Sequence, residues 1–273
     1  MKQLILTQCE VTAQRLDMRQ FTPDRLAQLT LDEIRRLPLY VGNRSELAGD
    51  LFDVSGEPSE RIHITTAASN LDFIGAGMRL GELTVIGDAG HGVAQGMSGG
   101  LLLVRGSTGD EAGTNISGGQ LRIEGHTGER LGGPSTGATQ GMSGGLIHVT
   151  GRAGDRAGER MRRGMILIDG DTGSYCGANM IAGTIVVQGT VYPMAGSGMR
   201  RGTLLLSREP HGLPATFNDN GIHDLSFLGL LLGELARNTQ LGAWGAAAPS
   251  VHRFLGDVGD GGIGEILWPA HGT

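Results

Sequence analysis

The chain has 273 residues, a formal net charge of −6 and 49 glycines, while aromatic residues make up 4% and charged residues 18%. This length allows one or two domains with a real hydrophobic core, and the acidic balance argues against general nucleic-acid binding. Two cysteines, Cys9 and Cys176, are too few for a disulfide framework or a thiolate metal site. No secretory leader is recognisable at the start and no apolar run approaches the ~18 residues of a membrane span. We therefore expect a soluble, cytoplasmic protein that does not engage membranes.

Residues 1–69 are predicted to form a cap of short helices and strands. Thr22-Pro23-Asp24-Arg25 predicts a helix start with proline at the first helical position, and Thr30-Leu31-Asp32-Glu33 predicts a capping box. Two short helices are therefore expected. Leu51–Gly56 and Ile62–Thr65 are strand candidates, and the second lies 19 residues before the first regular strand. We expect it to form an atypical first coil.

A repeat of 19 residues organises residues 70–207. One glycine recurs at spacings of 19, 19, 26, 19, 19 and 19 residues, and two further glycine series, six and nine residues on, keep the same register. Glycine tolerates positive φ and the close approach of another backbone, so such ladders are typical of tight turns in stacked coils. The first glycine series is Gly81, Gly100, Gly119, Gly145, Gly164, Gly183 and Gly202.

Each repeat also carries two branched aliphatic residues at alternate positions, which predicts a half-buried strand. The sequence thus predicts a mainly β fold, a single-stranded right-handed parallel β-helix of seven 19-residue coils with short flanking helices. The period fits neither hexapeptide helices nor leucine-rich repeats. The expected interior ladder is Leu83, Leu102, Leu121, Ile147, Ile166, Ile185 and Leu204. Two more inward ladders are Met78, Met97, Ile116, Met142, Met161, Met180 and Met199, and Ala112, Ala157, Cys176 and Ala195.

The single irregular spacing contains seven extra residues, 134–140. They add nothing to the repeat, so we expect a loop pushed out of one coil edge that folding does not require.

Residues 208–273 are predicted to form a loop followed by a helix over Ser226–Arg237 that packs on the β-helix. The helix is apolar nearly all round, so it should be buried. An aliphatic stripe is expected on the outer surface of the rod. Either this helix or a partner subunit could cover it, and both alternatives stay open. The stripe consists of Leu146, Met165, Leu167, Val186 and Leu205.

Catalytic and metal-binding patterns are missing from the sequence. No acidic row is stacked at one repeat position, and the eight histidines contain no His-x-His or His-Glu-x-x-His motif. We interpret His148 on a strand and His126 on a turn as solvated polar residues. Ser98 and Ser143, in the repeated Gln-Gly-Met-Ser-Gly-Gly, are interpreted as turn residues. We expect neither catalytic residues nor metal ligands.

Five arginines form the one candidate binding face, since they lie just before the strand glycines Gly164 and Gly202, at neighbouring offsets within the coil. Two interpretations stay open. The face is either a solvated edge, partly ion-paired with Asp155 and Glu159, or a surface that recognises an anionic cofactor or another subunit. The cluster consists of Arg160, Arg162, Arg163, Arg200 and Arg201.

The Gly-x-x-Met-x-x-Gly turns, as in Gly75–Gly81 and Gly96–Gly100, resemble the glycine-repeat domain shared by the C subunit of formylmethanofuran dehydrogenase and the C-terminal part of glutamate synthase large chains. The resemblance covers about residues 70–207. The preceding Leu37–Asn43 and Gly49–Gly56 resemble the formylmethanofuran protein in particular. Arginine supplies 21 of the 22 basic residues, which favours the bacterial relative, the formyltransferase/hydrolase complex.

This resemblance implies a complex that moves a formyl group between tetrahydromethanopterin and a methanofuran-type cofactor and releases formate, as a step of formaldehyde oxidation. Archaeal versions reduce CO2 with molybdenum or tungsten held in another subunit. The C subunit is implied to be architectural, to bind no cofactor through its own residues, and to assemble with A, B and D type subunits. The alternative is a glutamate synthase-like module in nitrogen metabolism. A secreted polysaccharide enzyme would need a leader and an acidic row, and both are missing.

Overall fold

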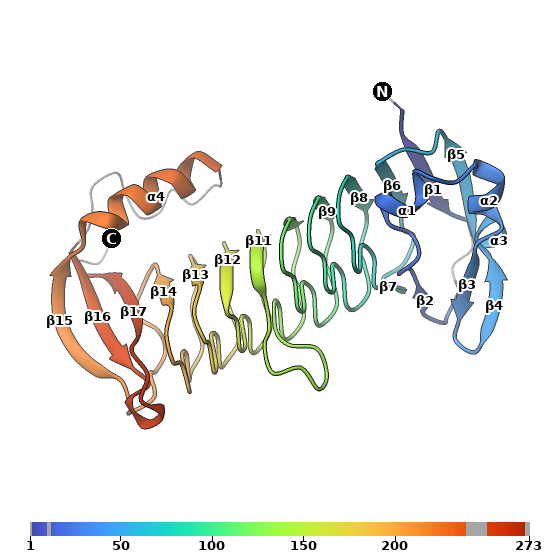
Figure 1. Cartoon of the computed structure of the whole chain (residues 1–273). Coiled ribbons are helices and arrows are strands. Elements are labelled where there is room, and N and C mark those ends of the chain that lie inside the picture. Colours follow the sequence, from blue (N-terminus) through green and yellow to red (C-terminus); the bar gives the residue numbers. More distant parts are fainter. Residues whose placement is uncertain (1, 10–11, 239–249, 271–273) are drawn as a thin grey trace.

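The computed structural model shows an elongated stack of strands with a mixed cap at each end (Figure 1). It describes residues 2–9, 12–238 and 250–270. Most of the strands described belong to one 13-stranded sheet. Its parallel central run consists of β6 (Arg61–Thr65), β8 (Glu82–Ile86), β9 (Leu101–Arg105), β10 (Gln120–Ile123), β11 (Ser143–Val149), β12 (Arg163–Ile168), β13 (Thr184–Val187) and β14 (Thr203–Leu206).

Equivalent residues of successive repeats face one another along this run. Leu83 pairs with Leu102, and the same position continues from strand to strand as far as Leu204. All seven residues of this ladder are buried, and so are the methionine ladder and the small-residue ladder. The three predicted inward ladders are therefore confirmed. A second line of parallel bridges joins Thr108, Thr127, Ala153, Thr172 and Val191.

Glycine is required where one turn of the chain rests on the next. Gly145 has φ +83°, and a Cβ added there would lie 2.7 Å from the carbonyl oxygen of Gly119. Positive φ is costly for other residues, and a neighbouring backbone cannot move aside without losing its strand pairing. The glycine ladder is thus the sequence signature of close stacking.

The N-terminal cap extends the sheet and adds a second, smaller one. The predicted helices are confirmed as α1 (Pro23–Leu26) and α2 (Leu31–Arg35), and Thr30 and Glu33 form the predicted capping box. The predicted register of β6 is wrong, because Ile62 pairs with Leu83, two residues away from the expected spacing. The remaining elements are β1 (Leu4–Gln8) and β5 (Phe52–Gly56), which join the large sheet, α3 (Ala48–Leu51), and the four-stranded sheet of β4 (Arg44–Leu47), β3 (Pro38–Val41), β2 (Leu16–Asp17) and β7 (Leu71–Asp72).

The C-terminal cap is richer in strands than predicted. Besides the expected helix, α4 (Ser226–Asn238), it contains β15 (Asn218–Asp224), β16 (Ser250–Gly256), a short 3-10 helix (Val258–Asp260) and β17 (Gly264–Pro269). The last strand pairs in parallel with β14, so that Ile266 lies beside Leu204. Parallel stacking therefore continues beyond the last predicted coil, and Leu204 is covered on both sides.

Helix α4 packs on the outer face of the sheet. Leu228 and Leu232 form a hydrophobic cluster with Leu167, Val186 and Leu205, so the chain covers this part of the stripe itself. The expectation of a helix buried all round is wrong, because the side chains of Phe227 and Leu230 are 47% and 81% exposed. The helix lies on a flat sheet and can bury only one face.

Candidate functional site

The arginine cluster lies on the turns that lead into β12 and β14. Arg162 directly precedes β12, and Arg163 is its first residue. Arg200 and Arg201 occupy the equivalent repeat positions two coils later. Since stacked strands are about 4.8 Å apart, the two arginine pairs are attached roughly 10 Å apart on the backbone. These four side chains are exposed, and Arg160 is half-buried.

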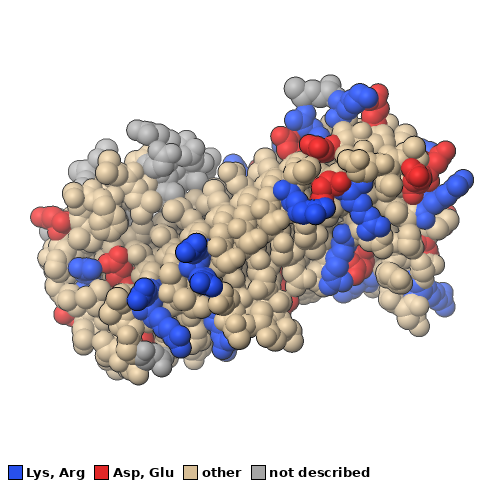
Figure 2. All heavy atoms as spheres, in the orientation of Figure 1, with Lys and Arg blue, Asp and Glu red and all other residues tan. Residues whose placement is uncertain are grey.

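The cluster keeps most of its positive charge unpaired. Glu159 lies 3.6 Å from Arg130 and 3.5 Å from Arg156 instead, and Asp155 accepts a hydrogen bond from the backbone N–H of Ser174 at 2.8 Å. The predicted ion pairs of the cluster with these two acids are therefore wrong. Within the described residues, four of the five arginine side chains make no hydrogen bond or ion pair. Figure 2 shows basic groups with few acidic neighbours over the part of the stack nearer the C-terminal cap.

The fifth side chain, Arg162, contacts the insertion at 134–140. It donates a hydrogen bond to Gln140 Oε1 at 3.0 Å. The loop is held from the preceding coil by Asn115, whose side chain donates to the carbonyl of Gln140 at 2.8 Å and accepts from the backbone N–H of Ser135 at 2.7 Å. The loop protrudes from the rod as predicted (Figure 1), yet these bonds fix both of its ends.

A pocket of about 400 Å³ lies between this loop and the cluster. Two guanidinium groups in one pocket wall favour an anionic ligand, because each can form paired hydrogen bonds with a carboxylate or phosphate. The pocket is lined by Thr139, Gln140, Arg160, Asn179, Ile181, Gly198 and Arg200.

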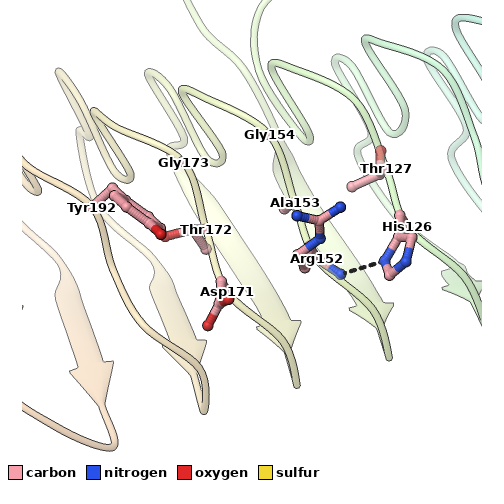
Figure 3. A pocket seen from close by; sticks show the side chains of 9 residues that line it. All are labelled: His126, Thr127, Arg152, Ala153, Gly154, Asp171, Thr172, Gly173 and Tyr192. Atoms are coloured by element: carbon pink, nitrogen blue, oxygen red, sulfur yellow. Dashed lines mark hydrogen bonds between the residues drawn. The ribbon is translucent and has the colours of Figure 1, made fainter.

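A second pocket, of about 390 Å³, opens on the line of parallel bridges (Figure 3). His126, Arg152 and Asp171 come from successive turns of the chain, and Tyr192 forms one end. The ring of Tyr192 stacks on that of His211 at a centroid distance of 5.5 Å. Thr127 and Thr172, both buried, also line this pocket.

Polar side chains around this pocket cap the backbone of the following turn. His126 Nδ1 accepts from the backbone N–H of Arg152 at 2.9 Å, and Asp171 accepts from that of Thr190 at 2.7 Å. In the preceding coil, Ser107 Oγ accepts from the backbone N–H of His126 at 3.1 Å. These acceptors satisfy N–H groups that the sheet leaves free. His126 is exposed, as interpreted from the sequence. It also accepts a backbone hydrogen bond from the next turn, and its fixed position in the repeat is the sequence feature that could have indicated this role.

His148 is not the solvated residue that the sequence indicated. It is only 5% exposed, and its Nε2 lies 3.0 Å from Asp169 Oδ2 in the next coil. The other carboxylate oxygen of Asp169 accepts from Gln188 Nε2 at 3.0 Å. Strand alternation correctly placed His148 on the outer face, but it does not reveal which outer positions are covered.

Other reactive groups are held in structural surroundings. Burial raises the pKa of the Cys176 thiol to about 12. Among the described residues, no three His, Cys, Asp or Glu side chains are grouped to hold a metal ion. The described helices also include none long and apolar enough to cross a membrane.

No family model matches the chain. The C subunit of the tungsten-containing formylmethanofuran dehydrogenase 2 of Methanothermobacter thermautotrophicus is 36% identical over 93 residues, which cover 32% of this chain and 34% of that protein. The C subunit of the formyltransferase/hydrolase complex Fhc of Methylorubrum extorquens is 39% identical over 77 residues, 28% of this chain and 29% of that protein. The matched segments thus span about a third of these curated relatives.

Structural similarity extends over nearly the whole chain. One chain in the crystal structure of the formyltransferase/hydrolase complex (FhcABCD) from Methylorubrum extorquens, in complex with methylofuran, matches with a TM-score of 0.89 and 35% sequence identity. The match covers 98% of this chain and 100% of that chain.

Proposed function

Since the chain belongs to the family formed by the C subunits of formylmethanofuran dehydrogenases and formyltransferase/hydrolase complexes, we propose that it is the structural C subunit of a bacterial formyltransferase/hydrolase complex. The observation that carries this proposal is the end-to-end match to a chain of such a complex. The proposed partners are subunits of the A, B and D types, and the proposed location is the cytoplasm. The chain itself is proposed to supply no catalytic residue.

The proposed reaction of the complex transfers a formyl group between tetrahydromethanopterin and a methanofuran-type cofactor and releases formate. The methylofuran bound in the matching structure supports the second of these cofactors. The proposed complex therefore acts late in the oxidation of formaldehyde. The family assignment supports this function over the glutamate synthase-like alternative.

For the architecture we propose a right-handed parallel β-helix of 19-residue coils, with residues 70–207 as the rod and residues 1–69 and 208–273 as its caps. The ladder from Leu83 to Leu204 and the second line of bridges support this form, because both repeat at the spacing of the glycines. Such a rod suits an architectural role, since stacked coils hold surface residues at fixed distances.

The arginine cluster is proposed to bind an anionic group, either the long acidic tail expected of a methanofuran-type cofactor or the acidic surface of a partner. Its unpaired guanidinium groups and the pocket lined by Arg160 and Arg200 support this role. Rigid coils fix these side chains at their attachment points, which limits the entropy lost on binding.

Deletion of the gene in the native host tests the proposed function. We expect loss of formyltransferase/hydrolase activity and of the assembled complex, with both restored by the wild-type chain. Unchanged assembly and activity in the deletion strain would contradict the proposal.

Four substitutions together test the arginine cluster: Arg162, Arg163, Arg200 and Arg201 to glutamine. Single exposed pairs contribute only about 0–1 kcal/mol, so the effect should emerge only in combination. We expect recovery of partners or cofactor to fall roughly tenfold, and to fall further as the salt concentration rises. The melting temperature should stay within a few degrees of wild type, because only the hydrogen bond of Arg162 to Gln140 is lost. The matched control changes three exposed arginines of the N-terminal cap to glutamine and should behave as wild type: Arg25, Arg36 and Arg44. Full retention in the quadruple variant would show that the cluster is only a solvated edge.

Deletion of residues 134–140 tests the contribution of the insertion. The deletion removes the hydrogen bonds of the loop with Asn115, Arg130 and Arg162 but no member of the three buried ladders. We therefore expect a loss of about 1–2 kcal/mol in unfolding free energy and weaker recovery of partner subunits. Normal recovery would leave the loop without a role in assembly.

A further inference from the structure

The outer face of the large sheet is covered by α4 over only part of its length. Beyond the helix, towards the N-terminal cap, aliphatic side chains still point outward from β8 and β9. Leu101 is 39% exposed, and Leu103, two residues further along the same face of β9, is half-buried. Ile86 is 44% exposed but lies at the other end of the strand pair, beside Arg105. Neighbouring exposed aliphatic side chains on a regular sheet are characteristic of an interaction surface.

A groove of about 270 Å³ lies beside Leu101 and Leu103, over β9, β10 and β11. Its apolar lining includes Leu101, Leu103 and Leu146, and its polar lining includes Gln120 and Arg122. Arg122 is exposed and, within the described part of the chain, its guanidinium forms no ion pair or side-chain hydrogen bond. The groove thus combines an aliphatic floor with one available positive charge.

The groove continues the surface on which α4 already packs. Leu146 lines the groove and also packs against the cluster that Leu228 and Leu232 of α4 form with the sheet. The same sheet face therefore already binds one helix through leucine side chains. A second apolar segment could extend this packing along the same row of strands.

We infer that this groove docks an amphipathic helix of another subunit of the same complex. Its aliphatic residues contact Leu101 and Leu103, and one of its carboxylates pairs with Arg122. The inference rests on the proposed function, which supplies the partner. The occupant is an acidic amphipathic segment, because an aliphatic floor beside a free arginine favours apolar contacts together with one negative charge.

Two charge variants of the tagged chain, expressed in the native host, test the docking surface. Leu101→Glu and Arg122→Glu should each lower recovery of the partner subunits by about tenfold, as expected at a central contact. Leu47→Glu is the matched control, because this leucine is 45% exposed but lies on β4 of the N-terminal cap. All three variants should keep the wild-type melting temperature within a few degrees, because surface substitutions rarely disturb folding.

A photo-reactive benzoylphenylalanine in place of Leu103 identifies the occupant in the same complex. We expect a cross-link to an acidic amphipathic segment of a partner subunit. Changing its carboxylate to arginine should restore recovery with Arg122→Glu. Cross-linking to residues 239–249 of this chain or to a second copy would overturn the inference, as would full recovery of partners by both charge variants. If the wild-type chain recovers no partners, the proposed function itself fails.

Discussion

Replacement of Gly145 by alanine should destabilise the protein far more than replacement of Gly137. Both glycines have φ +83°, so the added methyl group meets the same backbone strain at the two positions. Gly145 belongs to the ladder between stacked coils, whereas Gly137 is exposed in the insertion. Comparison of the two alanine variants therefore separates the free-energy cost of a clash between stacked turns from the free-energy cost of positive φ.

The expected magnitudes follow from the space around each Cβ. At Gly137 no atom lies within 4 Å, so only the cost of a left-handed alanine remains, about 1–2 kcal/mol. At Gly145 the methyl would lie 2.7 Å from the Gly119 oxygen and 3.0 Å from the Gly118 carbonyl carbon. This backbone belongs to the adjacent coil, and overpacking of this kind adds about 1–3 kcal/mol.

Thermal and denaturant unfolding of the two variants measure the difference. A difference of about 1–3 kcal/mol corresponds to a further drop in melting temperature of roughly 2–4 °C for each kcal/mol. Equal losses in the two variants would refute the argument that the coils rest on one another through the glycine ladder.

Three further outcomes are expected. Ile166→Ala and Leu204→Ala should each lower the free energy of unfolding by about 2–5 kcal/mol. The two losses should be similar, because β17 covers Leu204 as fully as the neighbouring strands cover Ile166. A much smaller loss at Leu204 would contradict its coverage by β17. Cys9 is exposed, whereas burial raises the pKa of Cys176 to about 12, so iodoacetamide should label only Cys9 in the native protein. Labelling of both thiols before unfolding would argue against the buried position. Burial, together with the nearby charges of Arg105 and Arg61, lowers the pKa of His63 below its ordinary 6.5, so the fold favours the neutral ring. The unfolded chain then takes up the proton first, and stability should fall as pH drops below about 6.5; His63→Gln should flatten this profile, and an unchanged profile would exclude the residue as its cause.

The core of the fold was predictable because the repeat carries it redundantly. Each coil repeats a glycine, an aliphatic pair and a methionine, replaced once by Ile116, at fixed positions, so the ladder from Leu83 to Leu204 followed from spacing alone. The cap strands β16 and β17 carry no such repeat. Strand β17 reaches its place beside β14 through a long excursion, and only tertiary contacts determine this pairing.

The candidate site was predictable in its residues but not in its contacts. The positions of Arg162 and Arg200 before strand glycines placed them correctly on equivalent turns two coils apart. Sequence distance made Glu159 a natural ion-pair partner, yet its carboxylate points to Arg130 and Arg156. Burial of His148 depends on which outer positions are covered, and strand alternation carries no information on that.

Native mass spectrometry of the tagged chain purified from its own host tests the central claim most directly. We expect a single assembly in which this chain accompanies A, B and D type subunits in fixed proportion. This assembly should show formyltransferase/hydrolase activity. The isolated chain should show none. Purification of the chain alone, or with an amidotransferase in place of these subunits, would contradict the account.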